Sequence, residues 1–196
     1  MRFIFSEDAF QRCLNDASSL LKASAALPSG TQSAALRGAL LLAVGAFDFL
    51  IHEIIRIEVV DRARSRNGNV RMEIPYSCLT SDGSATLSNE IDLHLRKNNS
   101  YKSFVSSSKI SDVFKIIDVR IWLTHQELTQ KDPRQTKANL DRIWEWRNRI
   151  AHEGDFIPSS LNFSYWPVYE IDVHDSINFL RDLGLEFLFV VRNISR

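Results

Sequence analysis

The chain has 196 residues, a size that suits one domain with a single hydrophobic core. It is 44% hydrophobic and 24% charged, and 24 basic residues balance 24 acidic ones. This neutral balance excludes a global positive field for nucleic acid, so any RNA contact must come from a local patch. No Pro-, Gly- or Ser-rich linker divides the chain, and we expect one domain over residues 1–196.

Cysteine content and hydropathy indicate the compartment. Cys13 and Cys78 have no spacing to another Cys or to His that indicates zinc, so we expect reduced thiols, no bound metal and no cofactor. The short apolar run at 1–5 meets acidic residues at once and lacks the core of a signal peptide. The apolar stretch 39–47 is well short of the roughly 20 residues that span a bilayer. These features predict a cytoplasmic protein without a membrane segment.

Two helices are predicted at the N-terminal end. Ser6 is the expected N-cap of the first, which reaches about Ala26 and is stopped by Pro28. The second runs from 32 to 64 and is the expected spine of the fold. Its apolar face contains one acid, Asp48, among Leu41, Val44, Ile51 and Ile55.

A polar insert, at about 65–107, follows the spine helix. Asn67-Gly68 is a turn signal, and the alternation of Val70, Met72 and Ile74 is typical of a short strand or hairpin arm. A short helix is predicted around 88–97. We expect the insert to vary in position and mobility.

Three helices are predicted after the insert. One spans 108 to about 128, and the last begins near Asp172 and Asp175. Between them, Asp132-Pro133 is a strong start signal, and the helix that it begins runs to His152 and stops at Gly154. The chain is therefore predicted to be an all-α bundle with an insert that has room for a β-hairpin.

The hexapeptide Arg147-Asn148-Arg149-Ile150-Ala151-His152 closes that middle helix and is the most informative motif. Arg147 falls in the apolar stripe formed by Leu140, Ile143 and Ile150, and a buried guanidinium needs a partner or a function. Asn148 and His152 stack four residues apart, whereas Arg147 and His152 diverge by about 140°. Because Asp48 also lies on an apolar stripe, we expect it to pair with Arg147.

The motif and the apolar spine helix with its central acid resemble the HEPN superfamily, whose motif is Arg, four to six residues, then His. The layout is most similar to the RiboL-PSP-HEPN branch. The resemblance implies a helical bundle, commonly dimeric, in which Arg and His of two copies line one cleft and cut RNA without a metal ion. It carries over Arg147, Asn148 and His152 as catalytic residues, and Asp48 as the family's acid on the second helix.

The chemistry of these side chains fits this function independently. His ionises near neutral pH, so it can take a proton from a ribose 2′-OH or return one to the leaving oxygen. Arg presents a planar fork that stabilises charge on a phosphoryl group. Asn148 could orient the phosphate or the imidazole. A His in the last helical turn is also typical of an ordinary helix C-terminus, and His152 alone would favour that interpretation.

Two other groups of residues are weaker candidates. Arg62, Arg64 and Arg66 cluster at the end of the spine helix and could bind an RNA backbone, although a solvated helix end explains them as well. Tyr165, Trp166 and Tyr169 could stack bases, but packing over a core or a dimer seam is favoured.

Our first hypothesis is a metal-independent endoribonuclease, a toxin or antiviral defence effector that acts as a homodimer; the sequence leaves open whether an antitoxin or regulatory protein restrains it. The alternative is a non-catalytic HEPN-like module that binds a nucleotide, RNA or a partner protein. A third interpretation is that Arg147 and His152 only tie helices together. The intact motif favours the enzyme.

Overall fold

The computed structural model describes residues 2–65, 69–73, 84–99, 101–158 and 164–194. Within these ranges the secondary structure is helical, and the only β pairing is an isolated bridge between Phe156 and Tyr165. The prediction of an all-α fold is confirmed. The helices are α1 (Ile4–Ser24), α2 (Ser29–Ser65), α4 (Ser84–Asn99), α5 (Ser107–Lys115), α6 (Ile121–Thr129), α7 (Pro133–Glu153) and α8 (Glu170–Ile194).

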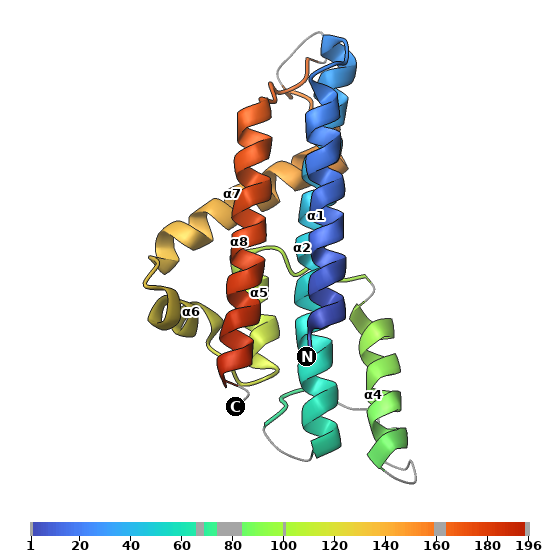
Figure 1. The fold of residues 1–196 in the computed structure, drawn as a ribbon, viewed down its shortest axis with the longest axis vertical. Helices are drawn as coiled ribbons and strands as arrows, with labels where there is room; N and C mark the ends of the chain where they lie inside the picture. Colours follow the sequence, from blue (N-terminus) through green and yellow to red (C-terminus); the bar gives the residue numbers. More distant parts are fainter. Residues whose placement is uncertain (1, 66–68, 74–83, 100, 159–163, 195–196) are drawn as a thin grey trace.

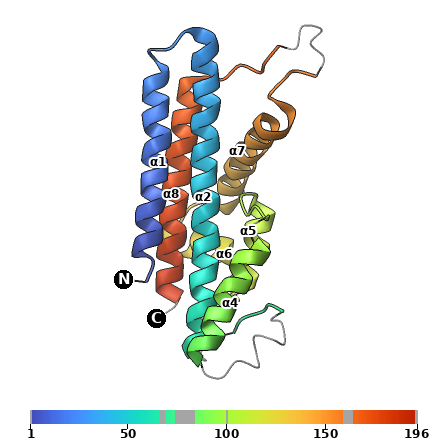
Figure 2. The ribbon, with the colours of Figure 1, turned by 90° about the vertical axis from the view of Figure 1, so that its right-hand side faces the viewer.

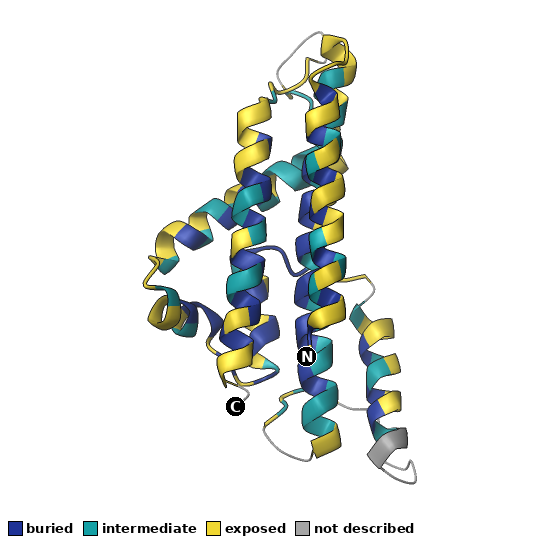
Figure 3. Ribbon diagram, in the orientation of Figure 1, coloured by how far each residue is buried: buried dark blue, intermediate teal, exposed yellow. Residues whose placement is uncertain are grey.

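Helices α1, α2 and α8 lie side by side along the long axis of the molecule, and their shared interior forms much of the core (Figures 1 and 2). Fully buried rings fill this interior: the ring centroids of Phe47 on α2 and Phe187 on α8 are 6.2 Å apart, and Phe10 of α1 lies against Gly184 of α8. Figure 3 shows that the buried residues of the three helices face one another. The apolar periodicity of the sequence therefore identified the main helices correctly.

Helix α2 is long and apolar enough to span a membrane by length and composition alone. In the structure it contacts α1, α4, α7 and α8, and 50% of its most apolar stretch is buried inside the protein. The core helix of a bundle has the same composition, because it meets apolar neighbours on several sides. Helix packing thus accounts for these residues.

The first helix starts earlier than predicted. Phe3 occupies the N-cap position, whereas Ser6 is buried inside α1 and donates a hydrogen bond to Oε2 of Glu53 at 3.2 Å. The hydroxyl that could have capped the helix is used in a contact with α2. The helix starts earlier because the Phe3 side chain is buried in the core, and this burial favours an ordered chain at that position.

The single helix predicted over 108–128 is wrong. The chain forms α5 and α6, with a left-handed residue, Asp118, at φ +56° between them. The break lets Ile117 and Val119, on either side of it, both be buried. It also lets Trp122 of α6 pack edge-on against Phe187, 5.4 Å away. Tertiary burial outweighed a helical pattern that its many β-branched residues make weak.

The insert contains the predicted helix, which is longer than expected and docks on α2 as α4. Arg56 of α2 donates to Oδ1 of Asp92 at 2.6 Å and to Oε2 of Glu53 at 2.7 Å. The pKa of Arg56 is raised, mainly by its hydrogen bond with Glu53 and further by that with Asp92. These bonds outweigh burial, which acts to lower it. Burial acts to raise the pKa of Glu53 and of Asp92, but the bonds and charge of Arg56 outweigh it and lower both. Both carboxyls are therefore ionised at neutral pH.

The predicted strand or hairpin is not formed in the described part of the insert. Residues 69–73 make one backbone hydrogen bond to another segment, from the Arg71 amide to the Ile116 carbonyl at 2.7 Å. None of these five residues is in a strand. Asn67-Gly68 and Ile74 lie outside the described residues.

Helix α7 crosses the bundle obliquely (Figures 1 and 2). The Asp132 side chain caps it by accepting the Arg134 amide at 2.8 Å, and it ends at Gly154 with φ +63°. Both predicted boundaries are confirmed. Asp141 fixes the middle of the helix by accepting the amide and the hydroxyl of Ser107 at 2.8 and 2.6 Å. The motif therefore lies on a helix that is anchored upstream.

Gly184 of α8 lies close against side chains of both α1 and α2. A Cβ there would be 2.6 Å from Cζ of Phe10 and 2.9 Å from Cδ2 of Leu50. We expect Gly184→Ala to lower the free energy of unfolding by about 1–3 kcal/mol, because overpacking forces the ring or the backbone to move.

Gly45→Ala is the matched control in α2, since its Cβ would meet nothing within 4 Å. Alanine should stabilise this helix by about 0.5–1 kcal/mol. Urea unfolding of both variants measures the difference. Equal stability of the two would contradict the close approach at Gly184.

Candidate functional site

The motif residues lie in the last two turns of α7. Nη1 of Arg147 donates to Oδ1 of Asn148 at 3.0 Å, and both residues are half-buried. His152 is exposed, and no residue that the structure describes hydrogen-bonds its ring. No contact joins Arg147 to His152 within the protomer, as the angle between them on the helix predicts. Asn148 therefore orients the guanidinium, and the imidazole faces solvent.

The pair predicted between Asp48 and Arg147 is wrong. The segment 101–106, which runs from α4 to α5 across α2, brings the Phe104 amide to Oδ1 of Asp48 at 2.7 Å (Figure 1). His52, one turn further along α2, lies 3.6 Å from the same oxygen and donates from Nε2 to the Lys102 carbonyl at 3.0 Å. Asp48 thus accepts a hydrogen bond from a backbone amide and lines a cleft of about 400 Å³ between α2 and α4.

Arg147 is also less buried than its apolar stripe indicated. Leu140 and Ile143 are buried, but Arg147 and Ile150, further along the same stripe, are only half-buried. The oblique path of α7 explains the difference, because its N-terminal half packs on the core and its C-terminal half rises toward the surface. The guanidinium is therefore accessible.

A buried ion cluster that the sequence did not indicate fixes the end of α7. Asp155 is 0% exposed, and its two carboxylate oxygens accept from Nε of Arg37 on α2 and from Nε of Arg149 on α7, each at 2.6 Å. Its amide donates to the Arg149 carbonyl at 3.0 Å. Asp155 has φ +59°, which Asp tolerates better than most residues. The cluster ties the turn after His152 to the spine helix.

The aromatic loop packs on this cluster. Tyr165 stacks on Phe156 at 4.5 Å, and the Arg37 guanidinium lies 5.0 Å from its ring centroid. The Trp166 amide donates to the Asp155 carbonyl at 2.9 Å, while its ring lies 5.0 Å from Cζ of Arg149. Tyr165 is nevertheless 58% exposed and Trp166 37%, so packing as the main role of these two residues stays a prediction. Tyr169 is 60% exposed.

The predicted RNA-binding arginines lie far from the motif. Arg37 and Arg62 are separated by about 37 Å along α2 at 1.5 Å per residue. Arg62 is used internally: it pairs with Glu58 at 3.3 Å and donates to the carbonyls of Asn69 and Ile117. Arg64 is exposed, and Arg66 lies outside the described residues.

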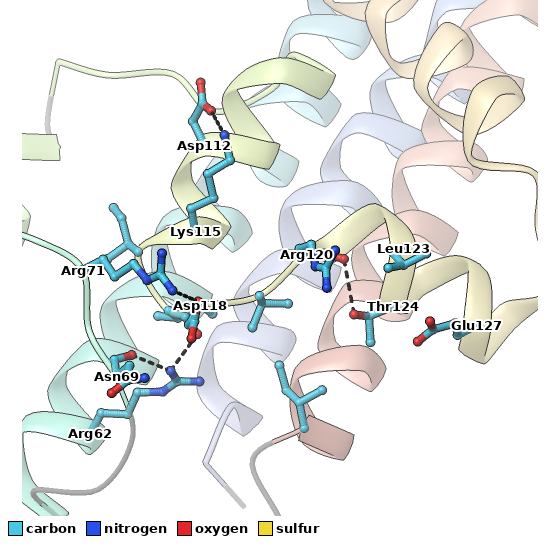
Figure 4. A pocket seen from close by; sticks show the side chains of 14 residues that line it. Arg62, Asn69, Arg71, Asp112, Lys115, Asp118, Arg120, Leu123, Thr124 and Glu127 are labelled. Atoms are coloured by element: carbon cyan, nitrogen blue, oxygen red, sulfur yellow. Dashed lines mark hydrogen bonds and ion pairs between the residues drawn. The ribbon is translucent and has the colours of Figure 1, made fainter.

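Arg62 lines a cavity of about 1030 Å³, shown in Figure 4. Two other cations at its wall are also paired, Arg71 with Asp118 at 2.6 Å and Lys115 with Asp112 at 2.8 Å, and Arg120 lines it as well. The cavity is therefore largely neutralised by the chain itself. The described residues include no group of three His, Cys, Asp or Glu side chains placed to hold a metal ion.

The family follows from a comparison with known proteins. A family model described as RiboL-PSP-HEPN matches residues 8–187, and the chain belongs to this family. No curated protein and no solved structure matches it. The superfamily includes many ribonucleases, so the fold and family are those of a ribonuclease or nucleotide-binding HEPN domain. The family match covers nearly the whole chain, including the insert.

We expect Asp155→Ala to lower the free energy of unfolding by roughly 3–5 kcal/mol, because it leaves two arginines around a site that has lost its only anion. Thermal and urea unfolding measure the loss. Asp175→Ala is the matched control: its side chain is 69% exposed and pairs with His174 at 3.3 Å. A surface change of this kind should stay within about 0.5 kcal/mol. Equal effects of the two substitutions would show that the cluster does not stabilise the fold.

Proposed function

We propose that the protein is a metal-independent endoribonuclease of the HEPN type, which acts in the cytoplasm as a homodimer. The observation that carries the proposal is the complete motif at an accessible helix end, with His152 exposed and Arg147 oriented by Asn148. A motif retained only to tie helices together would engage the imidazole, which has no described partner. We further propose that the cleavage serves as a toxin or antiviral defence activity under the control of an antitoxin or regulatory protein.

The proposed reaction needs only groups that the chain and the RNA supply. His152 removes the proton of the ribose 2′-OH, whose oxygen attacks the adjacent phosphorus. A P–O2′ bond forms as the P–O5′ bond breaks, and the proton is returned to O5′. Arg147 stabilises the charge on the non-bridging oxygens. The products are a 2′,3′-cyclic phosphate and a 5′-OH, and DNA is not cut because it lacks the 2′-OH.

The dimer supplies the geometry that one protomer lacks. Arg147 and His152 point about 140° apart on α7, so one phosphate cannot readily meet both from the same helix. A second copy related by a two-fold axis would place the Arg147 of one protomer opposite the His152 of its partner. We propose that Asp48, in its cleft with His52, supplies the acidic group of the second helix.

The first test is cleavage of bulk tRNA and of a defined single-stranded RNA in excess chelator. We expect cutting by the wild type, and a loss of about 10²–10⁴-fold in His152→Ala, the usual contribution of a general base. Electrophoresis and mass spectrometry identify the cyclic phosphate, and circular dichroism confirms the fold. His174→Ala, an exposed imidazole on α8, should cut normally.

Cleavage abolished by the chelator, or equal cutting of DNA, would contradict the mechanism. Cutting by His152→Ala at the wild-type rate would remove the proposed base. Binding of RNA without cleavage by the wild type would favour the alternative, a non-catalytic binding module.

The composite site can be tested by mixing Arg147→Gln with His152→Ala. Random exchange makes half of the dimers mixed, and each mixed dimer has one complete site, so we expect about a quarter of wild-type activity. Mixing His152→Ala with the double variant Arg147→Gln/His152→Ala is the control and should restore nothing. Without recovery in mixtures whose subunit exchange is demonstrated, the site would have to lie within one chain.

A further inference from the structure

Arg149 lies on the same face of α7 as His152. The two residues are three apart, so their side chains differ by about 60° around the helix, much less than Arg147 and His152. Only Nε of Arg149 is engaged, by Oδ1 of Asp155 at 2.6 Å. Among the described residues, none hydrogen-bonds Nη1 or Nη2, and the side chain is 33% exposed. Two donor nitrogens are therefore available beside the imidazole.

Arg37, the other arginine of the cluster, shows what a fully structural guanidinium looks like here. Its Nε donates to Asp155 at 2.6 Å, Nη1 to the Ser33 carbonyl at 3.2 Å and Nη2 to the Trp166 carbonyl at 2.6 Å. Its side chain is only 11% exposed. Arg37 alone could hold the buried carboxylate to α2. The terminal nitrogens of Arg149 are not needed for that task.

The surroundings of Arg149 fix its direction. Asp155 holds Nε, and the Trp166 ring lies 5.0 Å from Cζ, so the planar group is held on two sides. Two guanidinium groups share one carboxylate, which leaves a local excess of one positive charge (two minus one). Glu153, one turn further along the helix, makes no ion pair with Arg149 in the described structure. A fork held in this way loses little side-chain entropy when it binds an anion.

We propose that Arg149 is a second phosphate-binding residue, which uses Nη1 and Nη2 to bind an RNA phosphodiester next to the one that His152 attacks. Arg147 serves the transferring phosphoryl group, and Arg149 holds the strand in register. The proposal rests on the proposed function for the identity of the ligand as RNA. The binding itself does not depend on cleavage.

The test uses a fluorescent single-stranded 2′-O-methyl RNA, which can bind but offers no free 2′-OH to attack. Fluorescence anisotropy gives its affinity for the full chain at several salt concentrations. We expect Arg149→Gln to weaken binding about tenfold, as for loss of one charge-assisted contact. The slope of log K against log salt should fall by about 0.7, the value for one phosphate on a single strand.

Two variants control for charge and position. Arg134→Gln removes the same charge from an exposed site in the first turn of α7, about 22 Å away along the helix, and should leave affinity and slope unchanged. Arg149→Lys keeps the charge but loses the fork, so it should keep the salt slope and still bind more weakly. If both glutamine variants lose affinity equally, the effect is general and the proposal is overturned.

The fold is checked by circular dichroism and thermal melting, because Arg149→Gln leaves Asp155 with one partner. If that variant unfolds, Arg149→Gln/Asp155→Asn removes both charges and is compared with Asp155→Asn alone. Wild-type affinity and slope in a folded Arg149 variant would overturn the proposal, as would a wild type that does not bind. Binding that depends on Arg149 without any RNA cleavage would support this site and contradict the nuclease. RNA cleavage by a wild type whose RNA affinity does not change in Arg149→Gln would support the nuclease and contradict this site.

Discussion

The arrangement of the site depends on one buried carboxylate. Asp155 is wholly enclosed, and a lone charge in such a place is unstable without partners. Arg37, which is 118 residues earlier in the chain, and Arg149 supply them. The backbone is left-handed at Gly154 and Asp155, and this turn places the carboxylate within 2.6 Å of Nε of Arg37 and of Nε of Arg149. The position of His152 is thus set by a residue that never needs to touch substrate.

This anchor works together with a second one. Asp141 holds the middle of α7 to the start of α5 through Ser107, and Asp155 holds its end to α2. The motif lies between two carboxylates, each bonded to a different element. The half-buried stretch between them needs little core packing of its own. Polar anchoring can therefore leave the surface of the motif accessible and still hold it in place.

The features that could be predicted from the sequence are those that depend on neighbouring residues. The Asp132 cap, the stop at Gly154 and the apolar spine were readable because caps, turns and periodicity act within a few residues. The partner of Asp48 could not be predicted in this way, because a charge on an apolar stripe indicates burial but not which segment will cover it. That segment came from the insert, through the amide of Phe104. Asp155 gave no signal at all, because its partners are defined only by the tertiary fold.

The neutral charge of the chain makes these few groups important. With 24 basic and 24 acidic residues, no long-range field draws RNA to the surface. The cations at the far end of α2 are mostly paired, as Arg62 and Arg71 show. Under the proposed function, attraction of a phosphate backbone comes from guanidinium groups near the motif, such as that of Arg149. Such a protein would bind RNA through a small number of short-range contacts, so selectivity would depend on the shape of the strand at the site more than on its total charge.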